Sequence, residues 1–281
     1  MKKILKASLI LLAITVVAAG CSKGDAKAKG SKNEQKIVKL GVIGADTDVW
    51  DDVQSRLKDE GIKLEYVKFS DYNQPNGALA DGSIDLNAFQ HQFFLDNYNK
   101  EHKTDLVSIG NTVNAPMGIY SEKIKDLKKL KEGSEISIPN DVTNGGRALL
   151  LLQTADLIKV DPSKGQAPTV SDITENKKKF KITELDAAQT ARALQDVDIS
   201  VINSGVAVDS GFNPHKDAIF EEPVDEKSKP YVNIIVARKE DENNKVYQKI
   251  VDAYQTEDTK KVIEKTSKET SFPAWETFGR K

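Results

Sequence analysis

The sequence of 281 residues contains one cysteine and three histidines. A single thiol, Cys21, excludes an intramolecular disulfide, so the fold must be stabilised by its hydrophobic core. The histidines, His91, His102 and His215, are scattered without the spacing of a metal site. We therefore expect no metal and no cofactor.

Catalytic and nucleic-acid-binding signatures are also lacking. The chain has neither the Gly-x4-Gly-Lys-Ser/Thr loop that cradles phosphates nor a nucleophile elbow. Its 41 basic and 43 acidic residues give a net charge of -2, whereas binding to nucleic acid needs a surplus of Lys and Arg. We expect neither an enzyme nor a nucleic-acid-binding protein.

Only one long apolar run is present, at residues 9–19, and three lysines precede it. It is short for a membrane span, and the small residues Ala18, Ala19 and Gly20 stand directly before Cys21. This pattern predicts a lipoprotein signal peptide over residues 1–20, although leucine is more usual at position 18. The alternative, a transmembrane anchor with an incidental Cys21, is disfavoured by the short apolar core.

Cys21 is then the predicted first mature residue and the site of lipidation. Residues 21–36 contain no apolar cluster that could offset the entropy of ordering them, so we expect a flexible tether. Two or three acyl chains hold a protein firmly at a membrane. The sequence thus predicts a lipid-anchored protein on the extracytoplasmic face of the cell membrane.

The remaining chain alternates between strand and helix patterns, which indicates parallel α/β sheets. The first half predicts strands at 36–43, 62–69 and 83–89 with a helix at 49–60. The second half repeats this plan, with strands at 135–138, 180–185 and 199–202 and helices at about 147–157 and 188–195.

The segment 106–120 between these halves and the segment 231–237 after the second half are predicted to cross between lobes as a hinge. Final helices at about 245–268 are predicted to pack on the first lobe. We expect residues 37–118 and 232–281 to form the first lobe and 119–231 the second. Because ligands in open α/β sheets lie beyond the carboxyl ends of strands, facing lobes place both sets of strand ends at one cleft. This is the arrangement of a solute-binding protein.

Six sequence blocks carry a more specific resemblance. They are FSDYNQPNGALADGSIDLNAFQHQFFLDNY, APMGIYS, IPNDVTNGGRALLLLQ, DVDISVIN, KPYVNIIVA and SFPAW. In this order they resemble the methionine-binding lipoproteins of bacterial ABC importers, the MetQ/NlpA family, over about residues 37–275. The resemblance implies a type II periplasmic-binding-protein fold that captures L-methionine and delivers it to a permease. A methionine-containing dipeptide such as Gly-Met, or another small amino acid, is the alternative ligand, and we expect a monomer.

An amino acid needs a cation for its carboxylate. Arg147 follows Asn144-Gly145-Gly146 at the predicted start of a helix, where backbone N–H groups and a guanidinium converge on an anion. The residues alone equally allow a tight glycine turn with Arg147 in a surface ion pair. The resemblance favours Arg147 as the carboxylate ligand, with Asn144 beside it.

The ammonium group needs acceptors, and two asparagines interrupt apolar strands. Asn203 ends DISVIN, where it could also be a simple turn residue, and Asn233 interrupts YVNIIVA in a predicted hinge segment. A buried asparagine requires a partner, so we predict that both bind the ligand.

Aromatic side chains are expected to hold the thioether. Tyr72, Phe89 and His91 are the predicted wall, because sulfur packs well against aromatic rings. The family commonly has a Pro-Tyr pair where this chain has Phe93-Phe94, which leaves their places at the pocket open. Trp50 is expected to be either a hydrophobic anchor for its helix or a wall of the cleft.

Overall fold

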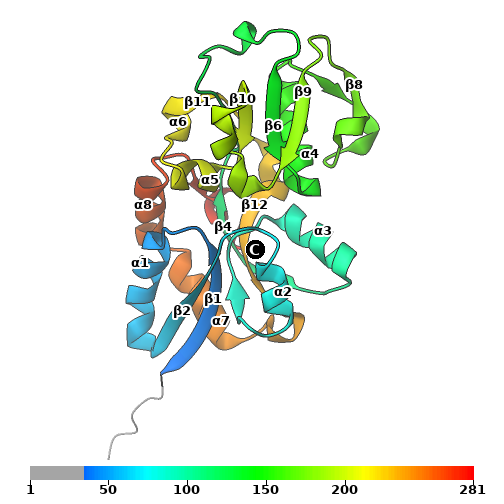
Figure 1. Ribbon diagram of the computed structural model, residues 1–281. Helices are drawn as coiled ribbons and strands as arrows, with labels where there is room; N and C mark the ends of the chain where they lie inside the picture. Colours follow the sequence, from blue (N-terminus) through cyan, green and yellow to red (C-terminus); the bar gives the residue numbers. More distant parts are fainter. Residues whose placement is uncertain (1–34) are drawn as a thin grey trace, which may run out of the picture. The chain divides into compact units, whose positions relative to one another are not determined.

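The computed structural model describes residues 35–281. The predicted signal peptide, Cys21 and nearly all of the predicted tether lie outside the described residues. Within the described part, two large sheets each carry their own helices, and β4 (Val107–Asn114) and β12 (Val232–Ala237) run towards the connections between them (Figure 1).

The first lobe is built on a six-stranded sheet in the order β13-β4-β12-β3-β1-β2. Its strands are β1 (Lys36–Ile43), β2 (Ile62–Phe69), β3 (Leu86–Asn87), β4 (Val107–Asn114), β12 (Val232–Ala237) and β13 (Phe272–Pro273). Its helices are α1 (Asp48–Leu57), α2 (Pro75–Ala80), α3 (Gln92–His102), α7 (Lys245–Tyr254), α8 (Glu257–Thr266) and α9 (Ala274–Thr277).

The second lobe is built on a five-stranded sheet in the order β11-β5-β10-β6-β9. Its strands are β5 (Gly118–Tyr120), β6 (Glu135–Pro139), β9 (Lys181–Leu185), β10 (Ile199–Ile202) and β11 (Ala218–Glu221). Its helices are α4 (Val142–Thr154), α5 (Ser204–Asp209) and α6 (Pro214–Asp217), and β7 (Lys159–Val160) pairs with β8 (Ile173–Glu175) beside them. Short 3₁₀ turns lie at Lys58–Glu60, Leu127–Lys129, Pro162–Lys164, Val170–Asp172, Ala187–Gln189, Arg192–Gln195, Glu226–Tyr231 and Lys239–Asp241.

Both sheets share one plan. In the first, β1 lies between β2 and β3 and is parallel to both, and β12 then pairs antiparallel with β3. In the second, β6 lies between β9 and β10 and is parallel to both, and β5 pairs antiparallel with β10. The prediction of two similar α/β lobes in series is confirmed.

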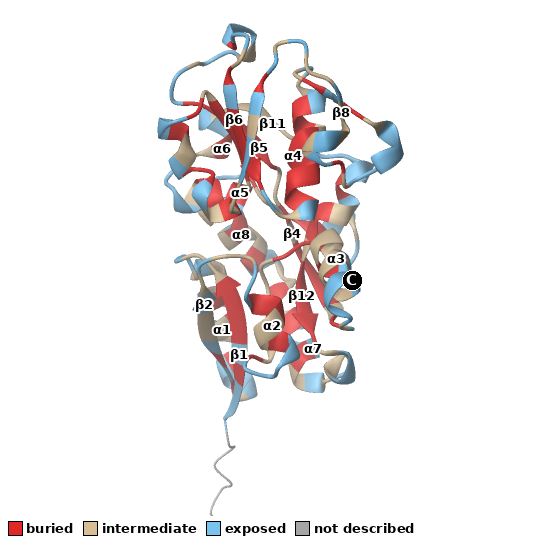
Figure 2. Cartoon of the chain, turned by 45° about the vertical axis from the view of Figure 1, so that its right-hand side comes forward, coloured by how far each residue is buried: buried red, intermediate tan, exposed pale blue. Residues whose placement is uncertain are grey.

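Each lobe has its own core because its strands and helices alternate apolar and polar faces. In the first lobe, Leu40 of β1 and Val53 of α1 lie in one buried cluster with residues of α7 and α8, as predicted for the final helices. In the second, Ile136 of β6 and Leu152 of α4 are fully buried together. Figure 2 shows this burial along β1 and along most of α4.

Two connections cross between the lobes. β4 and β12 pair antiparallel, with Asn114 opposite Val232, and the chain passes from β4 to β5 through residues 115–117. The single predicted crossing strand at 106–120 is therefore two strands with a break. The lobes also touch directly, since Lys268 Nζ donates to the backbone oxygen of Phe212 at 2.9 Å. The lobe boundaries given above stay a prediction.

Three further predicted elements differ from those in the structure. The expected helix at 188–195 consists of two 3₁₀ turns, because Asp186 accepts the backbone N–H of Ala188 and starts a tight turn instead. The third strand is only Leu86–Asn87, since the chain turns towards α3 after it. The helix expected from about 147 begins at Val142. No helix within residues 35–281 is long and apolar enough to span a bilayer.

Candidate functional site

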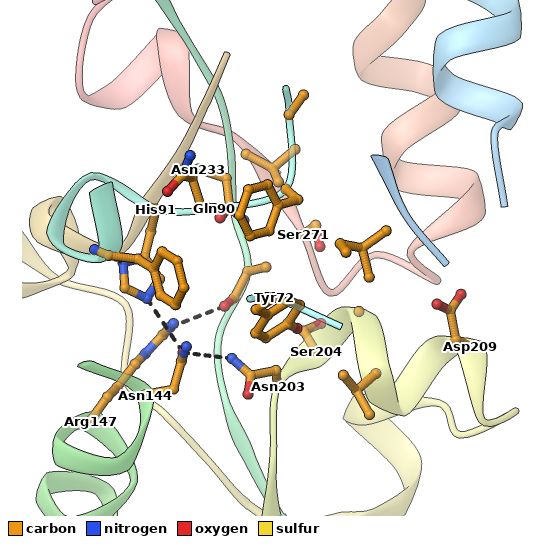
Figure 3. Close-up of a pocket in the computed structure, with 18 residues that line it drawn as sticks. Tyr72, Gln90, His91, Asn144, Arg147, Asn203, Ser204, Asp209, Asn233 and Ser271 are labelled. Carbon is orange, nitrogen blue, oxygen red and sulfur yellow. Dashed lines mark hydrogen bonds between the residues drawn. The ribbon is translucent and has the colours of Figure 1, made fainter. Parts of the chain in front are cut away.

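A pocket of about 220 Å³ lies between the lobes, and all seven predicted ligand contacts line it (Figure 3). The first lobe contributes Tyr72, Phe89, His91 and Asn233, and the second contributes Asn144, Arg147 and Asn203. They follow β2, β3, β6 and β10 or lie on β12, so strand ends from both sheets meet here as the sequence predicted. Their contact with a ligand stays a prediction.

Arg147 is almost fully buried, with 4% of its surface exposed. Its Nε donates to both carboxylate oxygens of Glu222, at 2.8 and 3.1 Å, and its Nη2 donates to Glu222 and to the backbone oxygen of Ala115. The guanidinium carbon lies 4.4 Å from the ring centroid of Tyr231. Nη1 makes no hydrogen bond to another residue within 35–281, which leaves this nitrogen for a ligand.

The local geometry around Arg147 differs from the prediction. Asp141 caps α4, and the backbone N–H of Gly145 donates to the Asp141 carbonyl at 2.8 Å, so Arg147 lies in the second turn of the helix and not at its free N-terminus. The two glycines are not a tight turn either. A Cβ at Gly145 would lie 2.8 Å from the carbonyl oxygen of Pro139, so the first turn of α4 packs closely against the end of β6.

Asn144 is hydrogen-bonded at both ends of its amide. Its Nδ2 donates to Asp141 at 2.9 Å, and its Oδ1 accepts from Nδ2 of Asn203 at 2.8 Å and faces Nε2 of His91 at 3.4 Å. Because these partners come from both lobes, Asn144 is a junction between α4, α5 and α3. Its amide orientation is set by the protein.

Asn203 directly follows β10 and occupies the N-cap position of α5, yet its side chain makes no capping hydrogen bond. Its Oδ1 is buried and has no partner among the described residues. A buried carbonyl oxygen without a donor is rare in folded proteins and costs free energy. This acceptor lies at the pocket and suits an ammonium group.

Asn233 lies where the pairing of β12 with β4 is irregular. The register places Val232 opposite Asn114 and Ile234 opposite Asn111, so the ladder bulges at Asn233. Bulges of this kind turn a side chain towards a binding site. Asn233 also forms an isolated bridge with His91, which joins the hinge strand to the start of α3.

His91 is neutral in this environment. Burial, and next to it the positive charge of Arg147, lower the pKa of His91 from 6.5 to about 3, against a smaller opposite effect of the hydrogen bond to Asn144. The ring therefore contributes no charge to the pocket at neutral pH.

Three aromatic rings form a wall. The ring of Tyr72 lies 5.9 Å from Phe89 and 6.3 Å from Phe94, and Phe94 lines the pocket. Burial is the main cause that raises the pKa of the Tyr72 hydroxyl, so it stays protonated. Phe93 instead faces Tyr231, at 6.4 Å between ring centroids, and borders a different hollow.

Trp50 belongs to the core of the first lobe, where its ring lies 4.8 Å from that of Tyr254. It also borders a second hollow of about 260 Å³, which shares Ser204, Asp209 and Ser271 with the first pocket. Trp50 thus belongs to the core beneath its helix and is not among the residues that line the first pocket.

Asp209 at the end of α5 was not predicted from the sequence. It lies at the opposite end of the pocket from Arg147 in Figure 3. Burial, and next to it the carboxylate of Asp46, raise the pKa of Asp209. A Cβ added at Gly44 in the first lobe would collide with the carboxylate of Asp209, so the two lobes are in close contact there.

A buried amide cluster behind the first lobe's wall was also missed. Asn76 Nδ2 donates to Gln90 Oε1 at 2.8 Å, and Asn87 Nδ2 donates to Asn76 Oδ1 at 2.9 Å. These contacts hold the chain between β3 and α3, which carries Phe89 and His91. In the sequence each of these three amides stands near apolar residues, which was the available signal.

The model of the NlpA lipoprotein family matches residues 38–275. The chain belongs to the NlpA lipoprotein family. The D-methionine-binding lipoprotein MetQ of Escherichia coli K12 is 45% identical over 215 residues, which cover 74% of this chain and 79% of MetQ.

Solved structures agree with this membership. A nutrient-binding protein from Burkholderia cenocepacia, bound to methionine, is 42% identical with a TM-score of 0.81 and covers 84% of this chain and 99% of its own. The substrate-binding protein of a methionine transporter from Streptococcus pneumoniae is 43% identical with the same TM-score, over 85% of this chain and 96% of its own. The predicted family and the two-lobed type II binding-protein fold are confirmed.

Proposed function

We propose that this NlpA-family protein is the extracytoplasmic substrate-binding lipoprotein of an ABC importer, and that it captures L-methionine between its lobes for delivery to the permease. The observation that carries the proposal is that one pocket joins the buried guanidinium of Arg147 and the buried Oδ1 of Asn203, and that Nη1 of the first and Oδ1 of the second have no hydrogen-bond partner within residues 35–281. The relatives named above for methionine binding support the same ligand.

The chemistry of the pocket suits each part of methionine. Nη1 of Arg147 can donate to the ligand carboxylate, and Oδ1 of Asn203 can accept from its ammonium group. Asn233 offers a further amide at the hinge. The rings of Tyr72, Phe89 and Phe94 provide the polarisable surface that a thioether prefers.

The ligand is tested first on protein as purified. Mass spectrometry of small molecules released by denaturation should find methionine. Refolded, ligand-free protein should then show a rise in melting temperature with L-methionine, because only ligands of the native state stabilise it.

The panel also contains D-methionine, Gly-Met, leucine and glutamine. A large rise with Gly-Met and little with methionine would replace the ligand by a dipeptide. The second hollow, which continues from the first pocket, is the observation that favours this alternative. A response to glutamine or leucine alone would refute a thioether pocket.

The partners of the proposed function are the permease subunits and the membrane. We propose that Cys21 is acylated and holds a monomeric, non-enzymatic protein on the outer face of the cell membrane. Cys21→Ser should abolish incorporation of labelled fatty acid and release the protein from the membrane fraction. Label on the variant would refute the assigned lipidation site.

A further inference from the structure

Glu222 contacts the side of Arg147 that faces away from the ligand pocket. Together with Arg147 and Tyr231 it lines a separate hollow of about 300 Å³, and it is not among the residues that line the ligand pocket. Its side chain is 16% exposed and also accepts the backbone N–H of Met117 at 3.1 Å. The carboxylate is thus held in place by a buried cation and by the hinge crossing.

The guanidinium of Arg147 has five N–H donors. One on Nε and one on Nη2 donate to Glu222, and Nη2 also donates to the backbone oxygen of Ala115. The two N–H groups of Nη1 have no partner within residues 35–281. The pocket therefore receives an arginine that can still donate hydrogen bonds but whose charge already has a counter-ion.

The other ionisable groups that line the pocket bring no second cation. Arg147 is the only lysine or arginine among the described residues that line it. His91 is neutral, since its pKa is lowered to about 3. Asp209 lies at the far end of the pocket (Figure 3).

We propose that Glu222 is a specificity-determining residue that restricts the pocket to ligands of zero net charge with one carboxylate and one ammonium group. A ligand carboxylate at Nη1 places a second anion against one guanidinium. In a desolvated pocket this is favourable only when the ligand brings its own ammonium group, from which Oδ1 of Asn203 can accept a hydrogen bond. Without Glu222, the uncompensated charge of Arg147 would favour anions. The inference rests on the proposed function and deepens it.

The test compares three ligands by calorimetry at pH 7. L-Methionine carries both charges, 4-(methylthio)butanoate lacks the ammonium group, and L-methioninol lacks the carboxylate. Wild-type protein should bind both singly charged compounds at least about tenfold more weakly than methionine. In Glu222→Gln, the ratio of the Kd of 4-(methylthio)butanoate to that of methionine should fall by about tenfold. The ratio of the Kd of methioninol to that of methionine should rise by a similar factor.

Glu222→Asp is the matched control, because it keeps the charge and changes only the reach of the side chain. Two results would overturn the inference and show that Glu222 is only a structural support. In the first, Glu222→Asp changes the affinity ratios between the ligands as much as Glu222→Gln does. In the second, the affinity for all three ligands falls by the same factor. If Glu222→Gln does not fold, wild-type protein decides: 4-(methylthio)butanoate binding within about threefold of methionine overturns it. Wild-type protein that binds no methionine at all would instead refute the proposed function.

Discussion

The Nδ1 atom of His91 accepts the backbone N–H of Phe94 at 3.0 Å, so this imidazole is the N-cap of α3. Because Nδ1 is the acceptor, the proton of the neutral ring lies on Nε2, which faces Oδ1 of Asn144 in the other lobe. One tautomer therefore starts a helix in the first lobe and contacts the second. Protonation of the ring would remove the cap.

The lowered pKa of His91 makes folding stability depend on pH. A group whose pKa is depressed in the folded state contributes stability above its unfolded pKa, and this contribution is lost as the pH falls. For a change from 6.5 to about 3, ligand-free wild-type protein should lose about 2 kcal/mol more between pH 7 and pH 5 than His91→Asn. Urea unfolding at a series of pH values measures this difference.

His91→Asn is the suitable variant because asparagine is also a good N-cap and does not titrate. His215, whose pKa is raised chiefly by its hydrogen bond to the Glu269 carbonyl and next by Glu221, is present in both proteins and cancels. If the free energy of unfolding falls with pH equally in the two proteins, His91 is not held neutral in the folded state.

Arg147→Ala should weaken methionine binding at least about a hundredfold, because the ligand carboxylate loses its charged partner in a desolvated pocket. The variant should also lose roughly 1–3 kcal/mol of stability, since Glu222 keeps a largely buried charge without its cation. Calorimetry and denaturation measure the two effects.

Arg56→Ala is the control, because it removes the ion pair of Arg56 with Asp52 on α1 and should leave methionine affinity unchanged. Affinity within a few-fold of wild type in folded Arg147→Ala would exclude this role.

Asn203→Ala should lower methionine affinity by about tenfold to a hundredfold, the range for loss of one hydrogen bond to a charged group. Asn213 is a matched control. It too lies at the N-cap position of a short helix, makes no side-chain capping bond there and has a buried Oδ1 without a partner among the described residues, but it does not line the pocket. Titration of both alanine variants should show a loss for Asn203 alone. An equal loss in both would point to general destabilisation.

Regular strands could be predicted from the sequence to within a residue. The segments 36–43 and 62–69 match β1 and β2 because their apolar residues alternate, and this pattern depends only on the strand itself. The alanine-rich segment at 188–195 has helical propensity, but local capping by Asp186 makes tight turns there. Gly145 and Gly146 suggested a turn, whereas close packing explains them. Such contacts are invisible in a single sequence.

More of the residues that line the pocket could be predicted from the sequence than of those that surround it. Asn144 and Asn203 follow strands of one sheet, and Phe89 and His91 follow a strand of the other, so topology alone brings them together. Asp209 and Glu222 come from segments without a periodic pattern. Their positions depend on how α5 and the crossing at residues 115–117 pack in three dimensions.

Gly44→Ala should accelerate methionine release and weaken its binding, because the added methyl group would collide with Asp209 when the lobes are together. Gly61→Ala separates this effect from backbone strain. Gly61 has a φ of +69° against +85° for Gly44, but a Cβ there would meet nothing within 4 Å. Stopped-flow release should be faster for Gly44→Ala than for Gly61→Ala at a similar loss of stability. Equal release rates would show that this seam does not hold the lobes.

The contact between Gly44 and Asp209 lies apart from Arg147 and Asn203, the groups assigned to the ligand's charged ends. Affinity at such a site is a product of two separable quantities, how well the ligand is recognised and how long the lobes stay shut around it. A graded series of side chains at position 44 would therefore tune dwell time while the choice of ligand stays the same. The seam at Gly44 would thus set how long the ligand stays bound, separately from the contacts of Arg147 and Asn203 with its charged ends.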